Sequence, residues 1–194
     1  MIVFSSYGFR TPVLQTKLRG RIDPAGKSVL LIPFAGVNEA GAAARETEGL
    51  CAFGFDRQRI IVAEEGMDIS FADVIYVPGG RTFRLLRRLR ECGLCEAVRK
   101  AVLSGATYIG VSAGAAAATR DMEYVTMFED NDEIVGGGFS ALAITDKTVI
   151  PHADSFSREH IAECRMLYCP DRDKYITVNN DEAVMLTENG FVYL

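Results

Sequence analysis

The sequence predicts an α/β fold in which helices cover both faces of a mostly parallel β-sheet. Short apolar runs of strand length recur along the chain, and longer segments of helical composition separate them. The run SVLLIP at 28–33 is continuously apolar and does not alternate with polar residues. A run of this kind is typical of a strand buried on both faces, as the strands of parallel sheets are.

The first part of the chain alternates between predicted strands and helices. MIVF at 1–4 is a short apolar run that leads into a Ser-Ser-Tyr-Gly turn, so we expect the first strand there. After the buried strand at 28–33, residues 38–53 have helical composition. RIIVA at 59–63 and DVIYV at 73–77 are two further apolar runs of strand length. This alternation favours parallel strands joined by helical crossovers.

Two helices and a strand follow, and the pattern then loosens. Residues 82–91 and 95–103 have helical composition and are separated by Gly93, and a strand is expected at 107–111. Later elements are expected as a strand at 148–150, a helix over about 157–168, and strands near 175–178, 183–186 and 191–194. We find no internal repeat and no convincing boundary, so residues 1–194 are predicted to form a single domain.

Composition argues against several classes of protein. The 194 residues include 21 Lys and Arg against 26 Asp and Glu, and this net charge of −5 gives no electrostatic support to a nucleic-acid partner. No apolar run approaches the length that spans a bilayer, and no basic segment followed by an apolar one opens the chain. We therefore expect a cytoplasmic protein without a membrane partner. Five cysteines, an odd number, fit reduced thiols better than a disulfide framework.

The stretch YIGVSAGAAAA at 108–118 predicts a strand, a sharp turn and a helix, with Ser112 at the bend. This is the G-x-S-x-G pattern of a nucleophile elbow, in which Gly110 and Gly114 leave room for a strained turn. The backbone N–H of Ala113 would then point to where an oxyanion forms. The alternative interpretation is an ordinary strand-to-helix turn with a serine N-cap.

A nucleophilic serine needs a base, and the chain has two histidines. His160 lies in a helical stretch, whereas His152 follows a short strand and a proline at the expected edge of the sheet, so we favour His152. A third group should orient the imidazole. Asp121, Asp154 and the cluster Asn179-Asn180-Asp181-Glu182 are candidates, and sequence spacing does not choose between them.

A second glycine-rich segment, Pro78-Gly79-Gly80, also follows a predicted strand and should lie at the same edge as Ser112. Gly80 could supply a second oxyanion donor, although a simple turn explains the glycines equally well. Arg81 begins a run of arginines on the next helix that is most simply a solvated face. Arg158, at the start of its helix, could clamp a substrate carboxylate.

Metal and redox chemistry are not expected. Cys92 and Cys95 form a single C-x-x-C, and Cys164 and Cys169 form a looser pair within a helical segment. A zinc site needs four ligands of convergent geometry, which these pairs do not predict. We expect neither a metal nor a cofactor.

Several segments in the same order resemble one known family over nearly the whole chain. They are SSYGF at 5–9, SVLLIPFA at 28–35, DVIYVPGGRTFRLLRRL at 73–89, YIGVSAGAAAA at 108–118, IPHAD at 150–154 and NDEAVML at 180–186. The family is peptidase family S51, that of the aspartyl dipeptidases (dipeptidase E) and, more distantly, cyanophycinase. The resemblance implies a flavodoxin-like, three-layer α/β sandwich related to the class I glutamine amidotransferases, whose elbow carries cysteine where this chain has Ser112.

The resemblance also implies site residues. It implies Ser112 as nucleophile, His152 as base, and the N–H groups of Gly80 and Ala113 as oxyanion donors. Asp121 matches an aspartate that the family places after the elbow helix and often credits to the charge relay.

Arg158 falls where family members bind the aspartyl carboxylate of the substrate, but the loop between His152 and Arg158 is shorter here. Arg81 replaces a usual asparagine and is a second candidate anchor for the substrate. The acid expected near the late strand falls on Asn180, with Asp181 beside it. Asp121 and Asp181 therefore remain alternatives for the third member of the triad.

The leading hypothesis is a cytosolic serine exopeptidase that hydrolyses short peptides, above all dipeptides with an N-terminal aspartyl residue, through an acyl-enzyme intermediate. Its partner would be a small peptide substrate, and the sequence leaves a homodimer open. The alternative is a non-peptidase member of the fold, either a small-molecule-binding protein or a catalytically lapsed enzyme. Arg81 and Asn180 motivate this alternative.

Overall fold

The computed structural model describes residues 1–129, 137–188 and 190–194. In these ranges the main sheet has seven strands in the order β3-β2-β4-β5-β1-β8-β9. Its strands are β1 (Ile2–Ser5), β2 (Val29–Leu31), β3 (Ile60–Val62), β4 (Val74–Val77), β5 (Thr107–Val111), β8 (Ala183–Thr187) and β9 (Gly190–Tyr193). Strands β1 to β5 pair in parallel, while β8 and β9 are antiparallel. The predicted mostly parallel sheet is confirmed.

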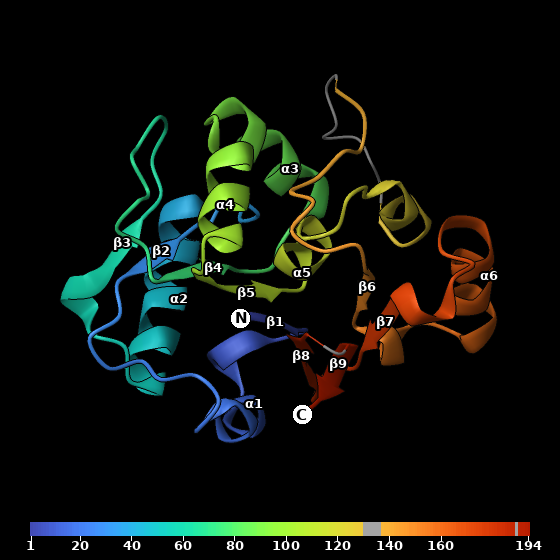
Figure 1. The fold of residues 1–194 in the computed structure, drawn as a ribbon, viewed down its shortest axis with the longest axis horizontal. Helices are drawn as coiled ribbons and strands as arrows, with labels where there is room; N and C mark the ends of the chain where they lie inside the picture. The colour runs from blue at the N-terminus through green and yellow to red at the C-terminus, as the bar shows by residue number, and fades with distance from the viewer. Residues whose placement is uncertain (130–136, 189) are drawn as a thin grey trace.

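Six α-helices lie in the described ranges (Figure 1). They are α1 (Pro12–Leu18), α2 (Glu39–Phe53), α3 (Thr82–Glu91), α4 (Leu94–Leu103), α5 (Ala113–Ala117) and α6 (Arg158–Tyr168). Short 3₁₀ helices lie at Gly8–Arg10, Arg57–Arg59, Glu123–Met127, Ala153–Ser155 and Arg172–Lys174. The bounds follow the sequence patterns closely, and Gly93, with φ of +68°, separates α3 from α4 as expected.

Helix α1 was not predicted, although local signals for it are present. The Thr11 side chain accepts a hydrogen bond from the Leu14 N–H at 3.3 Å, and Pro12 stands at the first helical position. A threonine N-cap followed by proline is a common helix start. The helix is only 7 residues long, so its apolar pattern is too short to show helical periodicity.

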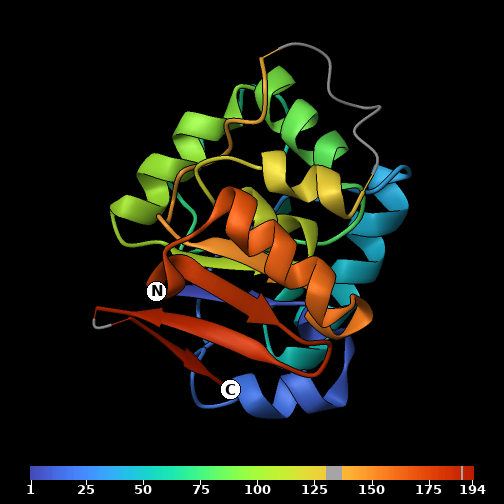
Figure 2. The same cartoon turned by 90° about the vertical axis from the view of Figure 1, so that its right-hand side faces the viewer.

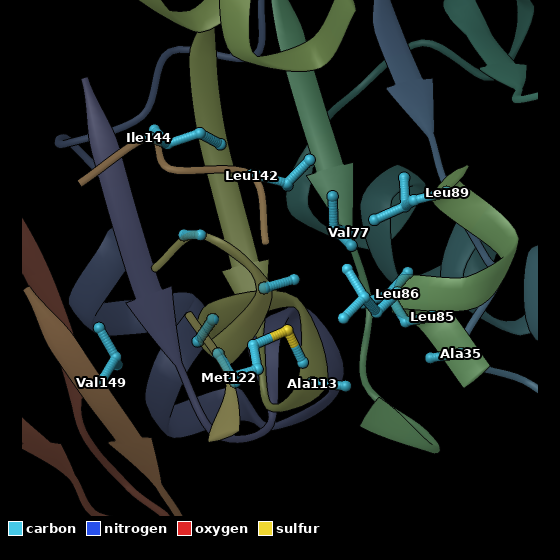
Figure 3. Close-up of a cluster of buried hydrophobic side chains, with 14 of the residues drawn as sticks. Ala35, Val77, Leu85, Leu86, Leu89, Ala113, Met122, Leu142, Ile144 and Val149 are labelled. Atoms are coloured by element: carbon cyan, nitrogen blue, oxygen red, sulfur yellow. The ribbon is translucent and has the colours of Figure 1, made fainter. Parts of the chain in front are cut away.

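The sheet separates two hydrophobic cores, which gives three layers. Along β4, Ile75 and Val77 join the core shared with α3, α4 and α5, whereas Val74 and Tyr76 join the core shared with α1 and α2. Adjacent side chains of a strand point to opposite faces, so both faces of this strand are buried. In Figure 1, α3, α4 and α5 lie above the sheet and α1 lies below it, and Figure 3 shows leucines of α3 packed beside Val77. Burial on both faces explains the continuously apolar strands.

A separate two-stranded parallel sheet stands beside the main one. It consists of β6 (Thr148–Pro151) and β7 (Tyr175–Val178), joined by a crossover that contains α6. Figure 2 looks onto the side of the molecule where α6 and the C-terminal strands lie. Val149 and Ile150 of β6 are buried in the same core as α5. This packing holds the small sheet next to the turn after β5.

Within the three described ranges, no helix has the length and apolar character that crossing a membrane requires.

Candidate active site

Ser112 lies in a strained turn between β5 and α5. Its backbone has φ of 50° and ψ of −112°, a conformation that side-chain-bearing residues rarely adopt. A Cβ on Gly110 would lie 2.6 Å from the Gly114 carbonyl oxygen, and a Cβ on Gly114 would lie 2.0 Å from the carbonyl oxygen of Val77. Both glycines are therefore required because backbone occupies the space of a side chain. The structure has the geometry of the predicted nucleophile elbow.

Tyr108 stabilises this turn through a buried hydrogen bond. Its hydroxyl donates a hydrogen bond of 2.7 Å to the Gly114 carbonyl oxygen inside the core. Burial raises the pKa of Tyr108 well above its usual range, so the phenol stays protonated and remains a donor.

The structure brings His152 to Ser112. His152 follows β6 with φ of 54°, and its Nε2 lies 3.0 Å from Ser112 Oγ. Its Nδ1 lies 2.7 Å from Oδ1 of Asn180, which follows β7. An amide oxygen can only accept, so Nδ1 carries the hydrogen and the lone pair of Nε2 faces the serine hydroxyl. This is the tautomer that a general base requires.

The structure corrects the expected position of Asp121. Its exposed carboxylate accepts a hydrogen bond from the Glu123 N–H at 2.8 Å, and the residue forms a β-bridge with Ser140. Among the described residues, the hydrogen-bond partner of His152 Nδ1 is Asn180 and not Asp121. Asp121 stabilises a local turn, because an Asx side chain can accept a hydrogen bond from the N–H two residues further along the chain.

Asp181 is also not in contact with the imidazole in the part of the chain that the structure describes. It is exposed, and its backbone oxygen accepts from Lys17 Nζ at 2.7 Å. Asp154, the other candidate, contacts the partner of the imidazole: its Oδ1 accepts a hydrogen bond from the Asn180 N–H at 3.1 Å. The sequence placed Asn180 within a cluster of candidate partners for the imidazole but did not single it out, and against the family pattern it stood as a departure from an expected acid. The signal that could have found it is the acceptor oxygen of its amide.

Two backbone N–H groups, those of Gly80 and Ala113, have no hydrogen-bond acceptor among the described residues. A Cβ on Gly79 would lie 2.8 Å from Ser112 Cβ, so the loop after β4 approaches the serine as predicted. Gly80 has φ of +149°, and a Cβ added to it would lie 2.4 Å from the Ala35 carbonyl oxygen. Its N–H has no hydrogen-bond acceptor among the described residues. The Ala113 N–H opens α5, where helical N–H groups have no acceptor within the helix.

The two arginines singled out in the sequence both lie at helix starts. Arg81 is the N-cap of α3, and its N–H donates to the Ala35 carbonyl oxygen at 2.9 Å. Arg158 is the first residue of α6, six positions beyond His152, and its side chain is exposed. Within the described ranges, Arg158 makes no ion pair.

His160 and the cysteines lie apart from this arrangement. His160 Nε2 is 2.8 Å from the Met127 carbonyl oxygen, and its ring packs against Phe128. The five cysteines are free thiols. In the part of the chain that is described, no group of three or more His, Cys, Asp or Glu side chains is placed to hold a metal ion.

A serine at an elbow, with an imidazole on its hydroxyl and free N–H groups beside it, is the architecture of hydrolases that transfer acyl groups. The chain belongs to peptidase family S51, whose family model matches residues 2–194. A peptidase E from Salmonella newport is 31% identical over 194 residues, covering 90% of this chain and 80% of that protein. An uncharacterized peptidase from Listeria monocytogenes is 27% identical over 169 residues, covering 83% and 82%.

Solved structures show the same fold. A 1.5 Å crystal structure of a Listeria monocytogenes protein described as a peptidase E matches with a TM-score of 0.77 at 22% identity, covering 100% of this chain and 96% of that chain. A peptidase from an acI-B1 actinobacterium matches with a TM-score of 0.71 at 17% identity, covering 100% and 86%. The fold class and family expected from the sequence are confirmed.

Proposed function

We propose that this peptidase is a serine exopeptidase whose catalytic residues are Ser112, His152 and Asn180. The observation that carries the proposal is the unbroken series of contacts from Ser112 Oγ through both imidazole nitrogens to the Asn180 amide, with distances of 3.0 and 2.7 Å. Both are hydrogen-bond distances, and they fix a single direction of proton transfer.

In the first step, Ser112 Oγ attacks the scissile carbonyl carbon and its proton passes to His152 Nε2. The oxygen of the tetrahedral intermediate accepts hydrogen bonds from the Gly80 and Ala113 N–H groups. As the C–N bond breaks, His152 gives the proton to the leaving amine, and an ester on Ser112 remains. Water then attacks this ester, donates a proton to Nε2, and the released serine oxygen takes that proton back.

Asn180 replaces the acid of the usual triad with a neutral acceptor. Cysteine peptidases with a Cys-His-Asn set use an amide in the same role. The amide works only if its oxygen faces the imidazole, since the NH₂ end would favour the wrong tautomer. Ser155 Oγ lies 3.5 Å from Asn180 Nδ2, and Asp154 holds the Asn180 backbone. In the orientation whose oxygen faces the imidazole, the Asn180 NH₂ group is directed to Ser155 Oγ, which can accept from it.

For the substrate, we infer short peptides with an N-terminal aspartyl residue. The support is the resemblance to the aspartyl dipeptidases and the exposed guanidinium of Arg158, six residues beyond His152. A substrate carboxylate that loses water on binding needs a cation to offset its desolvation. Arg158, and Arg81 at the start of α3, are the cations proposed for this role.

A fluorophosphonate probe tests the nucleophile, since only an activated serine reacts with it. We expect the wild-type protein to gain one adduct at Ser112, and Ser112→Ala and His152→Ala to gain none. The matched control is Ser70→Ala, an exposed serine outside the site, which should label like wild type. Dipeptide hydrolysis should fall by at least about a thousandfold in Ser112→Ala.

Failure of the folded wild-type protein to label would contradict the proposal and would favour a lapsed enzyme or a binding protein. Labelling of Ser112→Ala at the wild-type rate would place the reactive group elsewhere.

A further inference from the structure

Ser6 is a fully buried serine just beyond β1 that the mechanism above does not use. Its Oγ donates a hydrogen bond of 3.0 Å to the Val178 carbonyl oxygen and accepts one of 2.9 Å from the His152 N–H. Val178 ends β7, two residues before Asn180, and His152 directly follows β6. One hydroxyl therefore contacts both strands of the small sheet at the points from which the base and its amide partner emerge.

The residue before Ser6 holds the nucleophile. The Ser5 carbonyl oxygen accepts a hydrogen bond of 2.9 Å from the Ser112 N–H. Consecutive residues at the end of β1 thus bind the backbone of Ser112 on one side and the backbone of His152 on the other. The main sheet and the β6–β7 sheet share no ladder of strand hydrogen bonds in the described ranges. Ser6 supplies a direct polar link between them.

His152 needs such a link. Its φ of 54° is left-handed, a conformation that is strained for a non-glycine residue and persists only where the surroundings enforce it. The Ser6 hydroxyl binds the N–H of this strained residue. Without the hydroxyl, the His152 N–H and the Val178 carbonyl would both lose their partner, and buried unpaired groups of this kind drive local rearrangement.

We propose that Ser6 is a positioning residue that sets the distance between Ser112 and the His152–Asn180 pair. This inference rests on the proposed function. Ser6 does not touch the reacting atoms, so its effect passes through His152. A shift of about 1 Å in a catalytic group can lower the rate by about a hundredfold, because the reacting atoms must lie at contact distance.

Ser6→Ala tests the inference, with Tyr124→Phe as the matched control. The Tyr124 hydroxyl is also buried and also donates to this small sheet, at 2.6 Å to the Val149 carbonyl oxygen of β6, but it does not contact His152. Both substitutions remove one buried hydroxyl and should lower stability comparably. A Ser6→Cys variant keeps the shape with a weaker donor and acceptor, and covers the case in which Ser6→Ala does not fold.

Two measurements distinguish positioning from stability. The first is the rate constant of inactivation by the fluorophosphonate, separated from its binding constant. The second is the tautomer of His152 by imidazole ¹⁵N chemical shifts, which His160→Gln assigns because the chain has two histidines. We expect Ser6→Ala to lose at least about tenfold in inactivation rate with binding little changed. It should also show both tautomers where wild type shows only the Nδ1–H form.

Ser6→Cys should fall between wild type and Ser6→Ala, and Tyr124→Phe should keep the wild-type rate and tautomer. A folded Ser6→Ala protein with the wild-type rate and tautomer would overturn the inference. Equal losses in Tyr124→Phe would overturn it too, since general loosening would then explain both. If wild type does not label at all, the proposed function fails, while the tautomer comparison still decides the role of Ser6.

Discussion

Replacing Gly114 by alanine should destabilise the protein and disable the elbow together. The Cβ of the new residue would lie 2.0 Å from the Val77 carbonyl oxygen, 2.8 Å from its carbonyl carbon and 3.0 Å from its Cβ. Val77 belongs to β4, which pairs with β5, the strand that leads into Ser112. The clash is with backbone, so no rotation of a side chain relieves it. Either α5 moves off the sheet or the two strands shift.

The expected magnitude follows from this geometry. The contact falls about 1.4 Å short of ordinary van der Waals distance, which places the substitution at or beyond the upper end of the 1–3 kcal/mol usual for overpacking. Alanine gains about 1 kcal/mol over glycine in helix propensity, which offsets only part of this. A net loss of at least about 2 kcal/mol should lower the Tm by about 4–8 °C in a chain of this size.

Gly49→Ala is the matched control, because it makes the same change inside a helix with space available. Gly49 lies in α2, and the nearest atoms to a built Cβ, both of Phe9, are 3.9 Å away. This variant should be stabilised by about 0.5–1 kcal/mol. Thermal unfolding followed by circular dichroism measures both variants, and fluorophosphonate labelling measures Ser112. A Gly114→Ala protein as stable and as reactive as wild type would refute the steric account of the elbow.

Three further outcomes are expected. Arg158→Met should weaken transition-state binding of dipeptides with N-terminal aspartate, measured as kcat/KM, by about 2–4 kcal/mol, and it should leave neutral dipeptides almost unaffected. An equal loss for both substrates would mean that Arg158 supports structure instead. Asn180→Asp places a carboxylate at the 2.7 Å contact with His152 Nδ1 and favours the imidazolium. The acid limb of the profile of kcat/KM against pH should therefore move to higher pH, and an unmoved limb would contradict the contact. Burial raises the pKa of Cys164 to about 11, whereas Cys51 is partly exposed. Iodoacetamide at pH 8 should therefore alkylate Cys51 first and reach Cys164 only on unfolding, as peptide mass mapping would show.

Much of the fold could be predicted because the central strands β2 and β4 are buried on both faces. In DVIYV, Ile75 and Val77 face one core while Val74 and Tyr76 face the other, so apolar and polar residues do not alternate along the strand. The same holds for SVLLIP. Helix α1 escaped prediction because seven residues give too little periodicity. The pairing of β6 with β7 in a sheet of their own depends on how the crossover packs, which local pattern does not encode.

The site was predictable where the chemistry is local. Ser112 with Gly110 and Gly114 forms one continuous turn, so sequence alone places the serine at the bend. The partner of His152 is 28 residues away in sequence, in the turn after a strand whose position follows from tertiary packing. Motif matching therefore pointed to Asp121, which lies close in sequence to the elbow helix but serves its own turn.

The site is divided between two sheets, so its catalytic groups stay together only while the small β6–β7 sheet remains packed against the main sheet. Ser112 and Gly80 follow strands β5 and β4 of the main sheet, whereas His152 and Asn180 follow β6 and β7 of the small one. A small, separately paired sheet held by buried apolar contacts can open as a unit at a lower free energy than global unfolding. Such an opening would separate nucleophile from base while most helices and strands persist. Loss of activity on mild heating or in low denaturant should thus precede loss of secondary structure, and it should reverse as soon as the two sheets close again.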